Sequence, residues 1–214
     1  VVGGGPAGVL AAITAARRGR KCLLLERNDR LGKRLLITGK GRCNVTNNCN
    51  LINDLIANVP TNGRFLYGAF SKFMPSDTID FFEDMGVPLK VERGDRVFPV
   101  SDKAVDIVDA LNAYSQDAGV KRIKGRVTEL MIEDGRVRGV ITEDGEEYPA
   151  DKVIIATGGK SYPLTGSTGD GYELAKQAGH TVTELKPSLV PLNCHEGFCM
   201  DLQGLSLRNI EISV

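Results

Sequence analysis

The chain has 214 residues, which suits one large domain, or one domain with a piece of another. Its 27 basic residues balance 27 acidic ones, so the net charge gives no reason to expect a nucleic acid or an anionic membrane as a partner. No apolar run approaches the roughly 20 residues that span a bilayer, and no signal peptide is visible. Five scattered cysteines without C-x-x-C spacing favour reduced thiols in a cytoplasm, and we expect neither a disulfide framework nor a metal site.

The first eight residues carry the most informative motif. Val1-Val2 is typical of the end of a buried strand, and Gly3, Gly5 and Gly8 follow it with the spacing G-x-G-x-x-G. In this motif the first glycine takes a tight turn, the second lets a pyrophosphate approach the backbone, and the third lets the next helix pack closely. The helix N-terminus adds free N–H groups and partial positive charge. Because such turns also occur for purely structural reasons, the rest of the chain must support a dinucleotide site.

The segment after the glycines does support it. We expect an Ala-rich helix, followed by a strand over 21–26 that ends in an acid. Glu26 lies 18 residues after Gly8, close to the roughly 20 expected of the carboxylate that binds ribose hydroxyls. The alternative is a solvated glutamate at a strand end. The residues expected on one face of the helix are Ala7, Leu10, Ala11, Thr14 and Ala15.

A long glycine-rich and basic stretch, 27–50, comes next and has no obvious secondary structure. Structureless loops of this length in a compact domain are usually functional or disordered. Glycines permit close backbone approach, cations match phosphate charge, and amide and hydroxyl groups offer hydrogen bonds. We therefore predict ligand binding here, with a solvated surface loop as the alternative. The candidate side chains are Lys33, Arg34, Lys40, Arg42, Asn44, Thr46 and Asn47.

Two scaffold helices are expected after this stretch. The first is predicted to be capped by Ser76 and to stop at Gly86, and the second to be capped by Ser101 and to stop before Gly119. A turn and a short strand over 93–99 separate them. Their predicted buried residues are Ile79, Phe82 and Met85 in the first, and Val105, Val108, Leu111 and Ala118 in the second.

A strand over 120–123 is followed by a predicted meander. Strands over 127–133 and 136–142 flank Asp134-Gly135, and a second Asp-Gly turn leads to residues 146–148. We then expect a buried apolar strand over 151–159, because strands of a parallel sheet are covered on both faces. It ends in Thr157-Gly158-Gly159, where a ligand can lie against bare backbone.

One more helix completes the pattern. Gly166 to Gly171 opens it, with Asp170 as the expected N-cap, and Gly179 closes it. Its N-terminus is a second place where a phosphate or a flavin oxygen could bind.

Taken in order, these motifs resemble those of FAD-binding proteins of the glutathione-reductase type, near the fumarate reductase and aspartate oxidase flavoproteins. The loop over 32–47 and the stretch over 158–171 are more similar still to one bacterial family, described as aminoacetone-oxidase-like or bile-acid-reductase-like flavoproteins. The resemblance covers essentially the whole chain. It implies an α/β fold: a Rossmann-like parallel sheet with a β-meander, followed by the start of an inserted, mainly β domain.

The resemblance also implies which residues bind FAD. The glycine motif would hold the pyrophosphate, Glu26 the adenosine ribose and Val127 the edge of the adenine, while the 33–47 loop would run towards the flavin ring, with Cys43-Asn44 near it. The full predicted set is Gly3, Gly5, Pro6, Ala7, Gly8, Glu26, Arg27, Lys33, Arg34, Gly41, Arg42, Cys43, Asn44, Thr46, Val127, Thr157, Gly158, Gly159, Thr168, Gly169, Asp170 and Gly171.

By the same resemblance, residues 1–190 form an FAD-binding domain and 191–214 begin an inserted β-rich domain, with the first strand cut and a C-terminal return segment absent. The implied activity is that of an FAD-dependent oxidoreductase acting on a small organic molecule, with NAD(P)H as a transient reductant. The residues themselves expose no acid–base pair, and Cys43, which lacks the second cysteine of a redox dithiol, is expected to be a packed, inert thiol rather than a redox partner of the flavin. Two alternatives stay open: a non-redox FAD-binding module, and an NAD(P)-dependent dehydrogenase.

Overall fold

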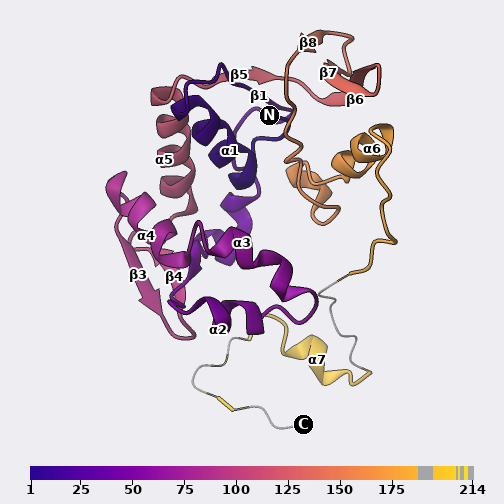
Figure 1. The fold of residues 1–214 in the computed structure, drawn as a ribbon. Coiled ribbons are helices and arrows are strands. Elements are labelled where there is room, and N and C mark those ends of the chain that lie inside the picture. The colour runs from indigo at the N-terminus through magenta and orange to yellow at the C-terminus, as the bar shows by residue number, and fades with distance from the viewer. Residues whose placement is uncertain (188–194, 206, 208–209, 212–214) are drawn as a thin grey trace. The chain divides into compact units, whose positions relative to one another are not determined.

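The computed structural model describes residues 1–187, 195–205, 207 and 210–211. The chain divides into two compact units, Val1–Val182 and Thr183–Val214. The first unit is an α/β domain (Figure 1). Its helices and strands are, in chain order, α1 Pro6–Arg17, β1 Leu23–Glu26, η1 Leu35–Gly41, β2 Thr46–Asn47, α2 Ile52–Ala57, η2 Gly63–Leu66, α3 Tyr67–Phe70, α4 Pro75–Asp84, β3 Leu89–Glu92, β4 Arg96–Pro99, α5 Ala104–Asp117, β5 Lys121–Lys124, β6 Val127–Glu133, β7 Arg136–Thr142, β8 Glu147–Pro149, η3 Pro163–Thr165 and α6 Asp170–Gln177.

A parallel sheet lies at the centre of this unit. β1 pairs with β5 in parallel, from Leu23 opposite Lys121 to Glu26 opposite Lys124. Val2 continues the sheet through parallel bridges to Leu25 on one side and Ile155 on the other. The order is therefore β5, β1, Val2 and Ile155, which confirms the predicted Rossmann-like parallel arrangement.

Helix α1 packs against this sheet directly after the glycine turn. Gly5 is its N-cap, Pro6 occupies its first turn, and Gly19 with φ +77° follows its end. The predicted helix is confirmed, but the predicted face is wrong. Its buried residues are Gly8, Val9, Ala12 and Ile13, because the helix turns the face of Gly8 towards the sheet.

Two hydrophobic clusters hold the unit together. The larger one joins α1, α4 and α5 to β1 and includes Val9, Leu24, Phe82, Ile107 and Leu111. The smaller one lies under the meander and consists of Val2, Leu25, Val127, Val140 and Leu174. Leu174 comes from α6, so this second cluster fixes α6 beside β6.

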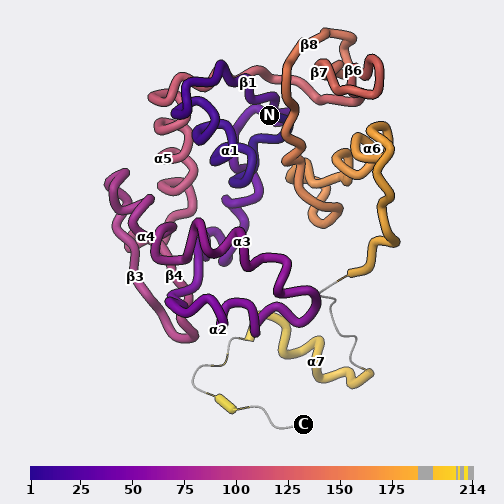
Figure 2. Tube along the Cα trace, viewed as in Figure 1, coloured from indigo at the N-terminus to yellow at the C-terminus, as the bar shows by residue number. Residues whose placement is uncertain are grey.

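The predicted meander is confirmed. β6, β7 and β8 form an antiparallel sheet in sequence order, joined by tight turns at positive-φ residues that include Asp134, Gly135 and Gly145. The tube in Figure 2 shows the three strands following one another as neighbours. A second antiparallel sheet, of order β2-β4-β3, is built from the 46–99 region.

The expectation of a buried strand over 151–159 is wrong. Only Ile155 forms a bridge, and Ile154 and Ile155 are 44% and 37% exposed. The backbone bonds on one side only, through Val2 N–H to the Ile154 carbonyl and Ala156 N–H to the Val2 carbonyl, both 2.8 Å.

The starts of three helices differ from the predicted caps. α4 begins at Pro75, whose ring suits the first turn, and the Met74 N–H donates to Asp77. α5 begins at Ala104, three residues after Ser101. The N-cap of α6 is Gly169 with φ +91°, not Asp170, because the Asp170 carboxylate accepts hydrogen bonds from other side chains.

The 27–50 stretch is more ordered than its composition indicates. It contains η1 and β2, and η1 is kinked at Gly39 and Lys40, both with positive φ. Short helices between 52 and 70, namely α2, η2 and α3, were also absent from the expectations. These segments lack the long apolar periodicity on which sequence-based assignment depends.

Arg42 ties this stretch to the second antiparallel sheet. Its guanidinium forms ion pairs with Glu92 and with Asp102, the latter with Nη2 at 2.6 Å, and lies 4.1 Å from the ring centre of Phe98. Lys90 also pairs with Asp102, at 2.8 Å. The hydrogen bond from Arg42 holds the pKa of Glu92 below its usual value, and hydrogen bonds from Lys90 and Arg42 do the same for the pKa of Asp102.

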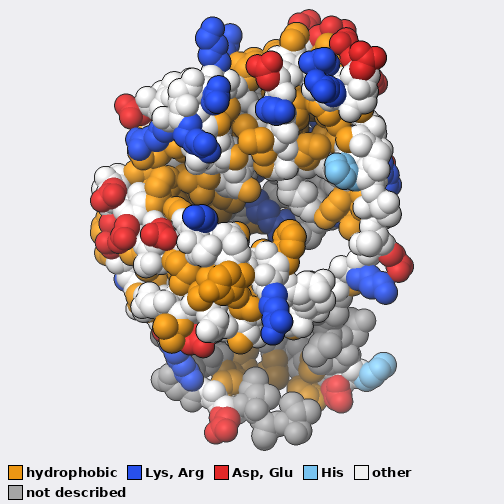
Figure 3. All heavy atoms as spheres, viewed as in Figure 1, with side chains coloured by type: hydrophobic (Ala, Val, Ile, Leu, Met, Phe, Trp, Pro, Cys, Tyr) orange, Lys and Arg blue, Asp and Glu red, His pale blue; other side chains and the backbone are white. Residues whose placement is uncertain are grey.

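The turn between α1 and β1 carries a basic cluster, which we define as Arg17, Arg18, Arg20, Lys21 and Lys121. Lys121 belongs to it because its N–H donates to the carbonyl of Cys22. All five side chains belong to exposed residues, and among the described residues none forms an ion pair. Figure 3 shows Lys and Arg side chains gathered at the upper left, over this turn and the neighbouring strand.

In the second unit the described residues include one helix, α7 Phe198–Asp201. The predicted domain boundary at 190/191 and the proposed domain entry at Val190-Pro191-Leu192 lie outside the described residues. The assignment of 191–214 to an inserted β-rich domain stays a prediction.

A Gly8→Ala substitution is expected to destabilise the domain by about 3 kcal/mol, because overpacking forces the backbone to shift. A Cβ on Gly8 would lie 1.8 Å from the Gly3 carbonyl oxygen. Thermal unfolding measures the effect, with an expected loss of about 6–12 °C for a domain of this size. Gly68→Ala is the matched control, because no atom lies within 4 Å of the new methyl group and alanine favours the α3 helix. An unchanged melting temperature in Gly8→Ala would contradict the described packing.

An Arg42→Gln substitution is expected to lower the free energy of unfolding near neutral pH, and to lower it less in acid. Because Glu92 and Asp102 have lowered folded pKa values, their pairing stabilises the protein above the unfolded pKa of about 4 and is lost as pH falls through the folded values. Urea unfolding between pH 3 and 7 should therefore show a wild-type advantage that is largest near neutrality and shrinks in acid. Lys72→Gln, at an exposed site, is the control. A wild-type advantage that grows towards pH 3 would contradict this assignment.

Candidate functional site

A cleft of about 560 Å³ opens beside the glycine turn of the first unit. The N-terminus of α1, the ends of β1 and of the 152–157 stretch, the start of β6 and the loop before α6 all border it. Predicted site residues that line it are Gly3, Gly5, Pro6, Ala7, Glu26, Arg27, Lys33, Arg34, Val127, Thr157, Gly158, Gly159 and Asp170.

The floor of the cleft is bare backbone. Gly3 has φ +102° and lies so close to the 156–157 backbone that a Cβ would be 2.5 Å from the Ala156 carbonyl oxygen. Gly5 differs, because nothing lies within 4 Å of a Cβ built there. The open face of Gly5 is therefore turned to the cleft, at a helix start whose first N–H groups have no intrahelical acceptor.

Glu26 ends β1 at the side of the cleft and is only 6% exposed. Its Oε2 accepts the Gly4 N–H at 2.6 Å, and its Oε1 accepts both the backbone N–H and the side-chain amide of Asn28 at 2.7 Å. An ionised carboxylate offers about four lone-pair sites. Three are used within the protein, so one acceptor position on Oε2 is left for a ligand hydroxyl.

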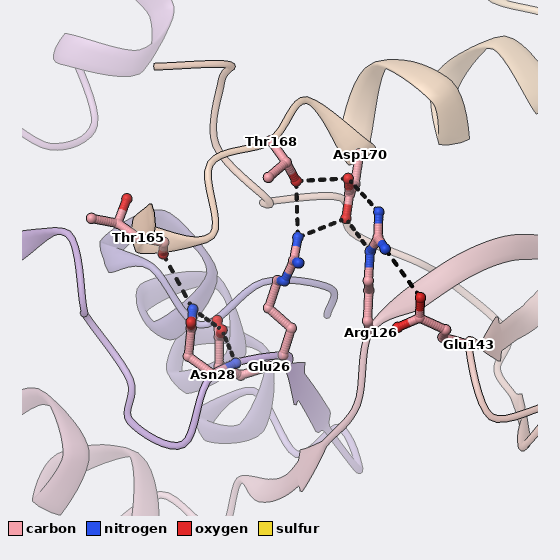
Figure 4. A network of polar contacts seen from close by, with 8 residues as sticks. Glu26, Asn28, Arg126, Glu143, Thr165, Thr168 and Asp170 are labelled. Carbon is pink, nitrogen blue, oxygen red and sulfur yellow. Dashed lines mark hydrogen bonds and ion pairs between the residues drawn. The ribbon is translucent and has the colours of Figure 1, made fainter. Parts of the chain in front are cut away.

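The Asp170 carboxylate, at the start of α6, lies beside the Arg126 guanidinium (Figure 4). The carboxylate accepts from Arg126 Nε at 3.0 Å and Nη2 at 3.2 Å, from Arg27 Nη1 at 3.3 Å, and from the Thr168 hydroxyl at 2.7 Å. Burial would raise the pKa of Asp170, but the hydrogen bonds from Arg126 and Thr168 and the charges of both arginines lower it below its usual value. Arg126 also pairs with Glu143 at 3.2 Å.

Neither Lys33 nor Arg34, two cations of the cleft, forms an ion pair within the described part of the chain, although Lys33 interacts with the charge of Asp29. The Lys33 ammonium lies 3.4 Å from the Asn28 side-chain oxygen. Arg34 donates to the Ser161 carbonyl at 2.6 Å and stacks 4.6 Å from the ring centre of Tyr162. Their positive charge is therefore available to an anionic ligand.

Thr157 supplies an unpartnered polar atom. Its hydroxyl oxygen is buried and has no hydrogen-bond partner among the described residues, although Thr157 also lines the cleft. A Cβ on Gly171 would come within 2.5 Å of that oxygen, so the hydroxyl lies against the start of α6. Buried polar groups are rarely left unpaired, which makes this hydroxyl a candidate for contact with a bound molecule.

The remaining predicted site residues do not line the cleft. Gly8 is at the helix–turn contact and Arg42 belongs to the ion pairs of the second sheet. Cys43 is 1% exposed in the larger hydrophobic cluster, and burial raises the pKa of its thiol, as expected of a packed thiol. The Thr168 hydroxyl bonds to two lining residues, Arg27 and Asp170. The other members of this set are Gly41, Asn44, Thr46, Gly169 and Gly171.

The sequence analysis also missed cleft residues. Arg126 and Asn28 are the most connected of them, through the bonds to Asp170 and Glu26. Arg126 directly precedes the predicted contact Val127, and Asn28 lies two residues after the predicted contact Glu26. This closeness in sequence is the signal that could have found them. The others that line the cleft are Val2, Gly4, Leu25, Gly125, Ala156, Ser161, Thr165, Gly166 and Ser167.

The described residues offer neither a metal site nor a membrane-spanning helix. They contain no group of three or more His, Cys, Asp or Glu side chains able to hold a metal ion. In the same part of the chain no helix has both the length and the apolar character to cross a membrane.

Comparison with known proteins identifies relatives of this chain. A 3-dehydro-bile acid delta(4,6)-reductase of Clostridium scindens is 37% identical over 196 residues, which are 90% of this chain and 46% of that protein. A ribosomal RNA dihydrouridine synthase of Escherichia coli is 30% identical over 207 residues, 96% of this chain and 50% of that protein. The chain thus spans about half the length of these curated relatives.

Solved structures share the fold. A 3-ketosteroid-delta4-(5alpha)-dehydrogenase from Rhodococcus jostii, in complex with 4-androstene-3,17-dione, matches 75% of this chain and 45% of its own, with a TM-score of 0.56 and 20% identity. THI4 of Thermovibrio ammonificans matches 84% and 62%, with a TM-score of 0.54 and 17% identity.

The family comparison covers nearly the whole chain. The model described as "HI0933-like protein Rossmann domain" matches residues 1–212. This match, with the bile-acid reductase among the relatives, confirms the flavoprotein resemblance found in the sequence. The chain belongs to the HI0933-like family of FAD-binding Rossmann-domain proteins.

Proposed function

We propose that this protein is an FAD-dependent oxidoreductase that adds hydrogen across a carbon–carbon double bond conjugated with a carbonyl group in a small organic molecule. The observation that carries the cofactor assignment is the open face of Gly5 at the N-terminus of α1, within a cleft that also presents Lys33 and Arg34. A diphosphate needs close backbone approach, a helix N-terminus and positive charge, and these three features meet at this point.

Other residues of the cleft fit the rest of FAD. The free acceptor position on Glu26 suits a ribose hydroxyl, and the unpartnered Thr157 hydroxyl suits a polar group of the same ligand. Val127, which is 3% exposed, offers its backbone beside Arg126 for the edge of a base. Gly158 and Gly159 leave backbone free for an extended ligand to pass.

When bound, FAD supplies hydride transfer between NAD(P)H and the substrate. The chain's own residues bind and orient that group. Lys33 and Arg34 would balance the phosphate charge, and Glu26 would fix the adenosine end while it holds the Gly4 N–H. The buried Cys43 takes no part, because its thiol is packed in the core and its raised pKa keeps it protonated.

The names of two relatives support the reaction class. A 3-dehydro-bile acid delta(4,6)-reductase acts on double bonds conjugated with a 3-keto group, and a dihydrouridine synthase adds hydrogen to the uridine double bond conjugated with its carbonyl. The two substrates differ in size and polarity, but the bond that changes is chemically alike. This shared chemistry is what we transfer to the present chain, with a keto-alkene as the first candidate because the reductase is the more similar of the two.

RNA is the second candidate substrate. Ribosomal RNA dihydrouridine synthases of Escherichia coli and Haemophilus influenzae are 30% and 28% identical to this chain, and the exposed basic cluster at the α1–β1 turn would attract phosphates. That cluster lies at the far end of α1 from the cleft, about 18 Å along a 12-residue helix. An RNA held there must extend over that distance to bring a base to the cleft.

We place this activity in the cytoplasm, as part of the same proposal. Cys22, Cys43 and Cys49 are free thiols, which is compatible with a reducing compartment.

The purified protein is expected to be yellow, or to become yellow with added FAD, and to be bleached anaerobically by NADPH or NADH. Addition of a 3-keto-Δ4 steroid should then restore the flavin absorption, while a uridine-containing ribosomal RNA fragment tests the second candidate. A protein that takes up no FAD would overturn the proposal. A yellow protein that no donor reduces would favour a non-redox module, and NAD-linked turnover without flavin would favour a dehydrogenase.

Gly5→Val is expected to abolish FAD retention while leaving the fold intact. The side chain meets no protein atom within 4 Å of its Cβ, so the melting temperature of the cofactor-free protein should stay close to that of wild type. The valine side chain would instead fill the space that a pyrophosphate needs. Flavin absorbance after gel filtration measures retention, and Gly68→Val, outside the cleft, is the control. Normal FAD occupancy in Gly5→Val would contradict the proposed site.

A further inference from the structure

The Asp170 carboxylate joins three separate parts of the chain. Arg27 directly follows β1, Arg126 directly precedes β6, and Asp170 is the first residue of α6. All three residues line the cleft. Figure 4 shows the Arg126 guanidinium turned towards the Asp170 carboxylate, with Thr168 beside it, and Arg27 pairs with the same carboxylate at 3.3 Å. Loss of that carboxylate would remove the ion pairs that join the end of β1 and the start of β6 to the start of α6.

A parallel contact reinforces the same junction. The Asn28 side-chain amide donates to the Thr165 carbonyl at 3.2 Å, and the Thr168 hydroxyl is held by Arg27 Nη1 at 2.9 Å. Gly166, with φ +96°, lies between these two contacts, and Gly169, with φ +91°, follows them; glycine adopts such positive φ values readily. The polar contacts therefore fix this loop against the β1 end.

The negative charge of Asp170 argues against a simple electrostatic attraction between this residue and the cofactor. A dianionic pyrophosphate is repelled by a carboxylate in the same cleft, and Asp170 and Glu143 together cancel the charges of Arg27 and Arg126. Positive charge for the phosphates then comes from Lys33 and Arg34. Because Asp170 reduces the positive charge of the cleft, it does not promote FAD binding by electrostatic attraction. Its hydrogen bonds to Arg27 and Arg126 indicate that it instead holds the shape of the cleft.

We propose that Asp170 is a positioning residue, an ionic clasp that gives the adenosine side of the cleft its FAD-binding shape through Arg27 and Arg126. The inference rests on the proposed FAD site; it gives a positioning role to Arg27 and Asp170, which the sequence analysis predicted as direct ligands, and to Arg126, which it did not predict. Thr168 supports the clasp because its hydroxyl accepts a hydrogen bond from Arg27 and donates one to Asp170.

The test is Asp170→Asn, with the dissociation constant of FAD measured by flavin fluorescence at a temperature where circular dichroism shows a folded protein. Removal of a charged hydrogen-bonding partner should weaken FAD binding about tenfold or more, although the substitution makes the cleft more positive. Glu143→Gln is the matched control: it removes one negative charge from the same Arg126, at a residue that does not line the cleft. Its FAD affinity should be unchanged or higher.

Two further variants separate the clasp from other roles. If Asp170 acts through Arg126, Asp170→Asn should weaken FAD binding much less in an Arg126→Gln background than in the wild-type protein. Asp170→Glu keeps the negative charge and should bind FAD more tightly than Asp170→Asn does. Equal or tighter binding by Asp170→Asn, or fully additive losses, would overturn the clasp. Should Asp170→Asn not fold, Thr168→Val should show a smaller loss in the same direction, and unchanged binding there would count against the proposal. Wild-type protein that binds no FAD would instead overturn the proposed function.

Discussion

The close backbone contact between the glycine turn and its neighbours is the constraint on which the rest of the domain depends. A side chain on Gly8 would collide with the Gly3 carbonyl, and one on Gly3 would collide with Ala156. Three chain segments therefore meet with no side chain between them. This contact lets α1 begin directly at the sheet, and it places the helix N-terminus where Val2 bridges both Leu25 and Ile155.

The cleft follows from that contact, because backbone forms its floor and charged side chains form its walls. Its cations fall into two groups with different surroundings. Arg27 and Arg126 form ion pairs with Asp170, whereas Lys33 and Arg34 form none among the described residues. Position in sequence alone does not separate these groups, since all four residues lie beside predicted ligand contacts. The Asp170 carboxylate, at the start of α6, distinguishes them, because it reaches Arg27 and Arg126 only in the folded domain.

Glu26 has a comparable double role. The sequence spacing predicts a ribose contact, and the structure shows that the same carboxylate also holds the Gly4 N–H and Asn28. A buried carboxylate needs such partners, because an unpaired charge is costly away from water. The residue can serve both the turn and a ligand since a carboxylate has more acceptor positions than the protein uses.

The sequence by itself determined the order and type of the main elements, because glycine turns, Asp-Gly hairpins and apolar periodicity are local signals. It located the floor of the cleft through Gly3 and Gly5. Only the tertiary structure decided that Arg42 belongs to the ion pairs of the second sheet, that Cys43 is core, and that Asp170 bonds to Arg27 and Arg126. Which charges pair, and which face of a helix is buried, depends on contacts between residues far apart in the chain, and no local pattern encodes those contacts.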